Sequence, residues 1–287
     1  DSNWTQAVIA KVMAFTDYQA FLSTLTAVME RVHEQFNQLV SEPGDEQQEQ
    51  DSLFSRCKDA WLLEVSENEF CDLLSDTLDE SSAMVLFEQL RDFRGQLSRH
   101  RIGQRGEDTL GKLMPEMIYY MLRQCPTNIT QLLPRLISVI GAITGRTTYL
   151  DLLHENPDVL KQLIKLCARS AWITEQIRSF PLLLDELLTP LYLQQQQTSL
   201  PLVYDEYSDE LRQSLLRVEP DDTELLMEQW RQFKLCQQLR IAASDISGSL
   251  PVAKVSDKLT VLAEVLLQAV FKSAWQQLTD KFGAPSH

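Results

Sequence analysis

The sequence contains little glycine and proline, 9 and 11 residues out of 287. A protein of many strands and tight turns needs both residues at its bends, so this composition disfavours a β-rich fold. No stretch alternates apolar and polar residues for long enough to predict a strand. Leucine, glutamine and glutamate dominate instead, and all three favour helices. We therefore predict an all-α protein, a multi-helix array of long and short packed helices with no significant sheet.

Long apolar runs and paired cysteine motifs are also missing. No run approaches the roughly 18 apolar residues of a membrane-spanning helix, and the first residues lack the basic leader of a signal peptide. We expect neither a membrane span nor a signal peptide. The 5 cysteines are scattered without CxxC spacing, which predicts reduced thiols and a cytoplasmic protein. Because an initiator methionine is absent as well, we expect a piece of a longer protein.

Recognisable catalytic motifs are absent too. The sequence has no P-loop, no GxGxxG dinucleotide fingerprint and no GxSxG nucleophile elbow. None of the 4 histidines pairs with another ligand at metal-site spacing, and no D-x-D pattern is present to hold two metal ions. We predict no catalytic, cofactor-binding or metal-binding residue within this chain.

Negative charge dominates, with a formal net charge of −15. Such a surface repels phosphate backbones, so we do not expect nucleic acid as a partner. The one basic concentration is RHRIGQRGED, residues 99–108, which carries Arg99, Arg101 and Arg105. It is either an exposed turn between helices or a contact site for an anion or an acidic partner.

Residues 42–51 interrupt the apolar pattern. A helix is predicted before them, over residues 16–40, where apolar residues recur at helical spacing. The interrupting stretch contains Pro43 and Gly44 and is otherwise almost entirely polar, which predicts a linker. A second loop is predicted over residues 192–208, because this stretch combines a glutamine tract with a proline and an acidic cluster.

Residues 239–259 read LRIAASDISGSLPVAKVSDKL and lie between two long apolar-patterned segments. A phosphate-binding loop needs several glycines whose N–H groups converge, but Gly248 is the single glycine here. Pro251 offers no N–H donor at all. The stretch is therefore predicted to be a structured connector between two long helices, the second of which reaches about Phe282.

Three long stretches carry a resemblance to a known family. They are residues 149–188, beginning YLDLLHENPDVLKQL, residues 231–264, beginning RQFKLCQQLRIAAS, and RGEDTLGKLMPEM at residues 105–117. Together they resemble the middle of the bacterial bifunctional glutamine synthetase adenylyltransferase/adenylyl-removing enzymes, the glutamate-ammonia-ligase adenylyltransferase family. The likeness covers the chain from about residue 82 to its end.

The resemblance implies a nucleotidyltransferase parent protein that uses ATP and Mg²⁺. One unit of such an enzyme attaches AMP to a tyrosine of glutamine synthetase, and the other removes the AMP by phosphorolysis. Each unit holds magnesium with a Ser-Asp-x-Asp pattern, and this chain contains neither copy. The implied partners are glutamine synthetase and the PII signalling protein, with glutamine as an effector in the control of nitrogen assimilation.

The family order predicts four segments. Residues 1–41 would be the last helices of the deadenylylating unit, and residues 42–51 a polar linker. Residues 52–125 would be a central regulatory helical region, and residues 126–287 the helical region that precedes the adenylylating core. We predict that the segment is a non-catalytic regulatory scaffold. The alternative is an interaction module that binds glutamine synthetase or PII. An unrelated α-solenoid adaptor is less favoured, because no fixed-period repeat is visible.

Overall fold

A computed structural model describes residues 45–62, 65–99, 102–189, 200–219 and 222–284. Within these ranges every regular element is a helix and there is no strand, which confirms the predicted all-α fold. None of the helices described is long and apolar enough to cross a membrane. The predicted helix over residues 16–40 lies outside the described residues.

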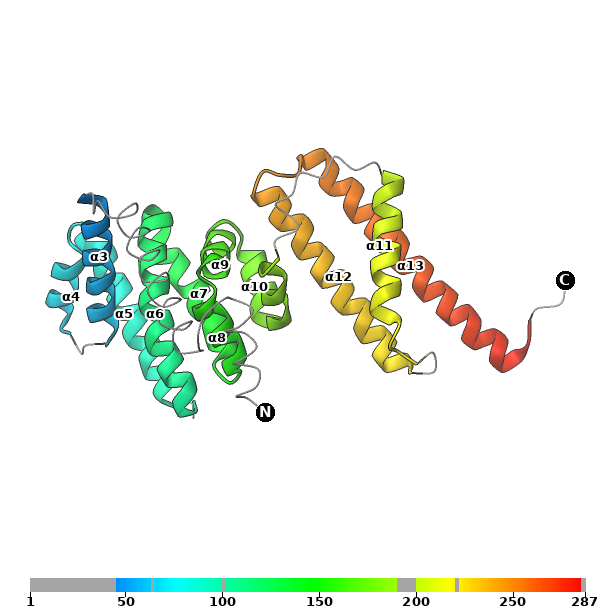
Figure 1. The fold of residues 1–287 in the computed structure, drawn as a ribbon, viewed down its shortest axis with the longest axis horizontal. Coiled ribbons are helices and arrows are strands. Elements are labelled where there is room, and N and C mark those ends of the chain that lie inside the picture. The colour runs from blue at the N-terminus through cyan, green and yellow to red at the C-terminus, as the bar shows by residue number, and fades with distance from the viewer. Residues whose placement is uncertain (1–44, 63–64, 100–101, 190–199, 220–221, 285–287) are drawn as a thin grey trace, which may run out of the picture. The chain divides into compact units, whose positions relative to one another are not determined.

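Figure 1 shows the described helices in chain order. They are α3 (Asp45–Leu62), α4 (Glu67–Leu74), α5 (Glu80–Arg99), α6 (Gln104–Gln124), η1 (Pro126–Asn128), α7 (Ile129–Ile143), α8 (Thr147–Glu155), α9 (Pro157–Arg169), α10 (Ala171–Ser179), η2 (Pro181–Leu187), α11 (Leu200–Leu215), α12 (Thr223–Ile246) and α13 (Val252–Phe282), where η marks a 3₁₀ helix.

The chain divides into two compact units, residues 1–55 and 56–287, and the boundary falls inside α3. Residues 45–51 of the predicted linker form the first turns of α3, and their role as a linker stays a prediction. Glutamate and glutamine have high helix propensity, so this polar stretch is helical without needing an apolar face.

Helix α7 forms the centre of the first group of helices in the larger unit. It packs against α5, α9 and α10, while α6 packs against α8 and α9. Apolar residues at helical spacing on α7, among them Leu133, Leu136 and Ile140, are completely buried. The same holds for Leu113 and Met117 on α6. This spacing places one apolar face of each helix in a shared core.

A proline inside α7 creates a specific contact with α5. Pro134 has no N–H group, so the Thr130 carbonyl oxygen four residues earlier has no intrahelical donor. The side-chain amide of Gln89 on α5 donates to that oxygen at 3.1 Å. The hydrogen bond missing from one helix thus becomes a link between two helices.

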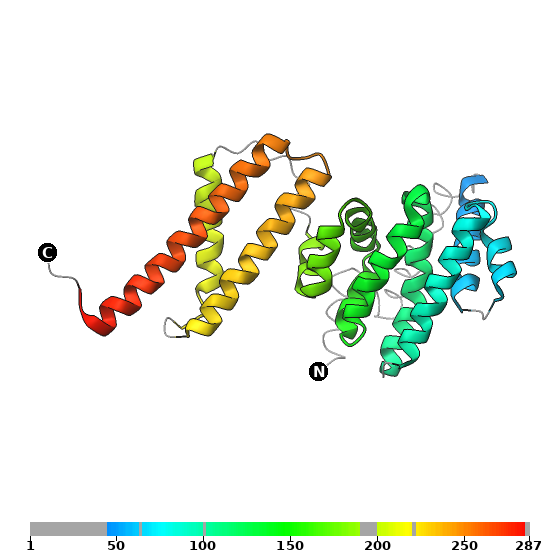
Figure 2. The ribbon, with the colours of Figure 1, turned by 180° about the vertical axis from the view of Figure 1, so that it is seen from behind.

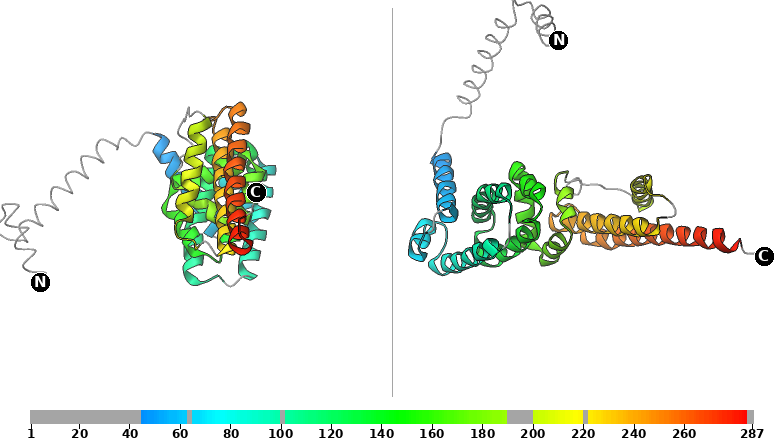
Figure 3. Two further views of the ribbon diagram at one scale, coloured as in Figure 1. Left: turned by 90° about the vertical axis from the view of Figure 1, so that its right-hand side faces the viewer. Right: turned by 90° about the horizontal axis from the view of Figure 1, so that it is seen from below.

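Helices α11, α12 and α13 lie side by side and form a second group (Figures 1 and 2). Their shared core consists of Val203, Tyr207, Leu211, Phe233, Ile241, Leu250, Val261, Leu262 and Val265. Figure 3 shows α12 and α13 running alongside each other.

The predicted loop over residues 192–208 is wrong from Leu200 onward, because α11 begins there. Val203, Tyr207 and Leu211 recur every four residues, so one face of the segment packs into the core of the second group. The proline in this stretch belongs to the first turn of the helix, where its missing N–H is not needed.

The predicted connector between α12 and α13 is confirmed as a tight helix-ending turn. Gly248 has a φ of +75°, a conformation that only glycine adopts readily. The Ser249 N–H donates to the Ser244 carbonyl oxygen at 3.0 Å, and the Gly248 N–H donates to the Asp245 carbonyl oxygen at 2.9 Å. These two bonds form a Schellman motif, which satisfies the last carbonyls of α12. Buried Leu250 then leads into α13.

Candidate functional site

The three arginines singled out in the sequence occupy different positions. Arg99 is the last residue of α5, and Arg101 lies outside the described residues. Arg105 stands in the first turn of α6, and its Nη2 donates to the Asp151 carboxylate of α8 at 2.6 Å. The hydroxyl of Thr109 also donates to Asp151, at 2.9 Å. Arg105 therefore already has a partner within the chain, and its proposed contact with an outside anion stays a prediction.

Asp151 is held in its charged form by these neighbours. The Thr109 hydroxyl is the main cause of its lowered pKa, and Arg105 contributes further. Gly106, in the first turn of α6, packs closely against the residue four positions before it. A Cβ at Gly106 would come within 2.7 Å of an Ile102 methyl group and 3.4 Å of a Thr147 methyl group. Gly106 is thus a point of close packing at the start of α6.

The most connected polar site surrounds Arg240 on α12. Its Nε donates to the Glu186 carboxylate of η2 at 2.5 Å, and its Nη1 donates to the Glu210 carboxylate of α11 at 2.7 Å. Gln237, one turn earlier on α12, donates to the other oxygen of Glu210 at 2.7 Å. One guanidinium therefore joins η2, in the first group of helices, to α11 in the second group. We call these residues the Arg240 cluster: Glu186, Glu210, Gln237 and Arg240.

Most of this cluster is protected from water, although the Glu210 side chain is 43% exposed. The side chains of Arg240 and Glu186 are 22% and 17% exposed, and Gln237 is almost fully buried. Burial by itself would lower the pKa of Arg240, but the Glu186 and Glu210 carboxylates outweigh it and the pKa is raised. A charge held in this way remains ionised at every physiological pH. Arg240 is thus a permanent cation that links the two carboxylates.

The same environment raises the pKa of two neighbouring side chains. Burial, reinforced by the charge of Glu186, raises the pKa of the Cys236 thiol to about 12. Burial and the charge of Glu210 likewise raise the pKa of Tyr207 to about 12. Neither group supplies a nucleophile near neutral pH. The chemistry of the cluster is therefore that of holding helices in place.

A second contact joins the two groups of helices at the C-terminal end of α12. Arg169, the last residue of α9, donates from Nη1 to the Ile246 carbonyl oxygen at 2.5 Å. Ile246 is the last residue of α12, where carbonyl groups lack intrahelical donors. A cation at this end also complements the helix dipole. Helix α12 is therefore held by side-chain contacts from η2 and from α9.

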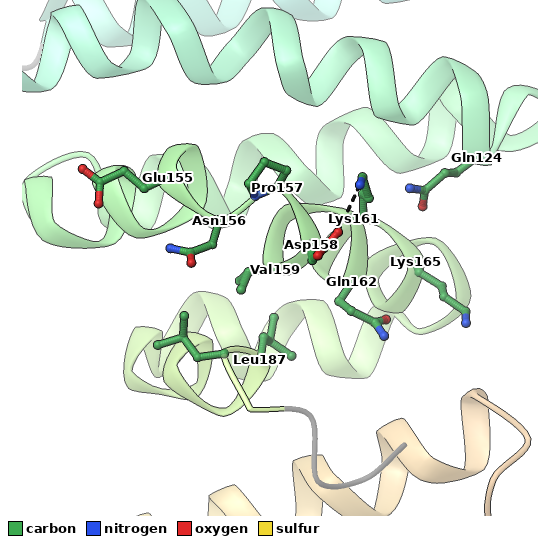
Figure 4. A pocket seen from close by; sticks show the side chains of 11 residues that line it. Gln124, Glu155, Asn156, Pro157, Asp158, Val159, Lys161, Gln162, Lys165 and Leu187 are labelled. Atoms are coloured by element: carbon green, nitrogen blue, oxygen red, sulfur yellow. Dashed lines mark hydrogen bonds and ion pairs between the residues drawn. The ribbon is translucent and has the colours of Figure 1, made fainter. Parts of the chain in front are cut away.

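A cleft of about 650 Å³ adjoins these contacts, between the start of α9 and the end of η2 (Figure 4). Lys161, Gln162 and Lys165 of α9 line it together with Leu187, the residue after Glu186. Figure 4 shows Lys161 paired with Asp158, at 3.0 Å. Among the described residues, Gln162 Oε1 is one of the few buried side-chain atoms without a hydrogen-bond partner.

Sequence reasoning missed the Arg240 cluster. One signal was available: Gln237, Arg240 and Ser244 are polar residues at helical spacing on a face that also carries apolar side chains. The partners could not be inferred, because Glu186 precedes Arg240 by 54 residues. Within the residues that the structure describes, no group of three His, Cys, Asp or Glu side chains could hold a metal ion.

Comparison with known proteins agrees with the resemblance stated from the sequence. Residues 160–287 match the family model described as glutamate-ammonia ligase adenylyltransferase. Over all 287 residues the chain is 56% identical to a bifunctional glutamine synthetase adenylyltransferase/adenylyl-removing enzyme from Alteromonas mediterranea. The match covers 100% of this chain but 29% of that enzyme, so the chain spans less than a third of the relative's length.

Proposed function

From the similarity of this chain to the glutamate-ammonia ligase adenylyltransferase family, we propose that the chain is a regulatory and scaffold segment of a nucleotidyltransferase. The whole enzyme would transfer AMP from ATP, with Mg²⁺, to a tyrosine of glutamine synthetase and remove it again by phosphorolysis. The segment itself would carry out neither reaction. Its role would be to hold the two reaction centres in a fixed relation to each other and to pass the effect of bound effectors between them. The enzyme would work in the cytoplasm.

The Arg240 cluster is the observation that supports this role best. Coupling between distant sites needs a contact whose two sides move together. Arg240 reaches Glu186 on η2 and Glu210 on α11, and so ties the two groups of helices at a single side chain. Arg169 adds a second tie at the end of α12. An effector that moved α9 or η2 would therefore displace α12.

The non-catalytic part of the proposal has a direct test. The chain is incubated with glutamine synthetase, labelled ATP and Mg²⁺, and the label on glutamine synthetase is counted. No transfer is expected, because neither Ser-Asp-x-Asp pattern is present. Transfer above that of a protein-free control would refute the proposal.

The coupling part is tested in the enzyme that contains the segment. Arg240→Ala should blunt the response of both activities to glutamine and PII, while Arg231→Ala serves as the matched control. Arg231 lies on the same helix but pairs at the surface with Glu228, three residues away. An unchanged effector response in Arg240→Ala would exclude coupling through this cluster.

The alternative role, an interaction module, predicts a different result. In that case the chain alone should bind purified glutamine synthetase or PII with high affinity, and calorimetry can measure this. A coupler needs no such affinity, because its contacts are internal to the enzyme. Binding by the isolated chain would therefore favour the module.

A further inference from the structure

Helix α13 carries a row of large apolar side chains that are exposed to solvent. Leu267, Phe271, Trp275, Leu278 and Phe282 are 70%, 69%, 49%, 55% and 73% exposed. We call these residues the α13 stripe. The rings of Phe271 and Trp275 stack on each other with centroids 6.2 Å apart.

The stripe forms a second apolar face of the helix. At 100° per residue its members fall within an arc of about 80°, centred about 130° around the helix from the core-facing residues. Those core-facing residues are Val261, Leu262 and Val265, which are buried against the other two helices of the group. Figure 1 shows α13 continuing past the start of α12 toward the C-terminus. The stripe thus has no role in the core already described.

The size of the stripe indicates a docking surface. A fully exposed aromatic side chain offers roughly 200 Å², so the five residues leave roughly 600 Å² of apolar surface in water. This is at the upper end of the largest apolar patch on an ordinary monomer, and patches of that size mark interaction sites. Scattered single apolar residues would need no such explanation.

The charged residues beside the α13 stripe indicate what kind of surface could cover it. Between residues 267 and 282 the charged residues are Lys272, Asp280 and Lys281, a local excess of base in a chain of net charge −15. A surface with an apolar centre and an acidic rim complements this arrangement. A second copy of the chain is disfavoured, because two bodies with a charge of −15 repel each other.

A longer protein has further polypeptide that could cover the stripe. The part of the Alteromonas relative that matches this chain is 29% of its length, so most of that protein lies outside the match. Helix α13 ends at Phe282, the last member of the stripe, and Gly283 with a φ of +82° breaks the helix there. A segment attached at this point has a millimolar effective concentration beside the stripe, which no free partner matches.

We propose that, in a protein as long as this relative, the α13 stripe is the docking face for polypeptide that lies C-terminal to residue 287. The docking segment presents an apolar surface with an acidic rim. This inference does not require the protein to be an adenylyltransferase, so the experiment below uses no activity as its readout.

Cysteine labelling tests the proposal. Leu278→Cys is placed in the 287-residue chain and in the same chain extended through its natural downstream sequence, and maleimide labelling of each peptide is followed by mass spectrometry. Labelling at position 278 should be at least about tenfold slower in the longer protein, since a packed site labels only when it opens. Leu216→Cys is the matched control: Leu216 is 77% exposed and lies outside the stripe. Equal rates at position 278 in both lengths would overturn the proposal.

A second measurement excludes the other occupant. The labelling rate at position 278 in the 287-residue chain should not depend on protein concentration. Protection that appears as the concentration rises would show that a second copy covers the stripe, and that result contradicts the proposal. The paired change Phe271→Asp with Leu278→Asp should lower the unfolding temperature of the longer protein by several degrees and leave that of the 287-residue chain almost unchanged.

Discussion

Arg240 and Glu186 lie 2.5 Å apart, Nε to Oε2, although 54 residues separate them in the sequence. Glu186 belongs to the last turn of η2, and Arg240 to the face of α12 that meets it. Both side chains are less than a quarter exposed. Loss of one partner would therefore leave the other as a poorly solvated charge without a counter-ion. Substituting one partner tests how much the pair contributes to stability.

Removing Arg240 should destabilise the protein strongly. Arg240→Ala leaves Glu186 and Glu210 partly buried without their cation, and such losses cost about 3 kcal/mol. The free energy of unfolding in urea measures this cost. Arg231→Ala breaks an exposed pair on the same helix and should change stability by less than about 1 kcal/mol. Equal effects of the two substitutions would show that the Arg240 cluster contributes no more than a surface pair.

Gln89 and Pro134 should be energetically coupled. Gln89→Ala removes the donor to the Thr130 carbonyl oxygen and should cost about 1 kcal/mol. In a Pro134→Ala background the helix supplies its own N–H to that oxygen, so the cost of Gln89→Ala should shrink. A double-mutant cycle by chemical denaturation gives the coupling energy. Strictly additive costs would mean that the Gln89 bond does not compensate for the proline.

Two glycine substitutions should act in opposite directions. Gly248→Ala forces a side chain into a φ of +75° and should destabilise the protein by about 1 kcal/mol. Gly95→Ala lies within α5, where a new methyl group meets nothing within 4 Å, and should stabilise it by up to about 1 kcal/mol. Thermal unfolding monitored by circular dichroism distinguishes the two. A neutral Gly248→Ala would argue against the Schellman turn.

Asp79 should titrate well below other aspartates. The hydroxyl of Ser81, and then the side chain and backbone of Ser82, stabilise its charged form and lower its pKa from 3.8 to about 2. Because the folded pKa lies below the unfolded one, the stabilisation is present above the unfolded pKa and is lost as pH falls toward 2. An NMR titration of the Asp79 carboxyl measures the value, and Ser81→Ala should raise it. A pKa near 3.8 in the unmodified protein would contradict this account.

Helices with one strongly apolar face could be predicted from the sequence. A helix of mixed composition and the contacts between distant elements could not. The apolar spacing of α7 and α9 is strong enough to place both, and Pro157 marks the start of α9. Helix α11 was missed because an acidic cluster and a proline outweighed the regular recurrence of Val203, Tyr207 and Leu211. The Arg240 cluster could not be anticipated, since its carboxylates come from elements distant in the sequence.

The Schellman turn at Gly248 has a mechanical consequence. Only residues 247–251 separate α12 from α13, so a rotation of α12 about its contacts with η2 and α9 is passed directly to the next helix. With 31 residues, α13 is about 46 Å long. A tilt of about 5° at its beginning would carry its far end through about 4 Å, the distance between packed atoms. A small shift at Arg240 would therefore become a displacement at Phe282 that is large enough to open or close a contact there.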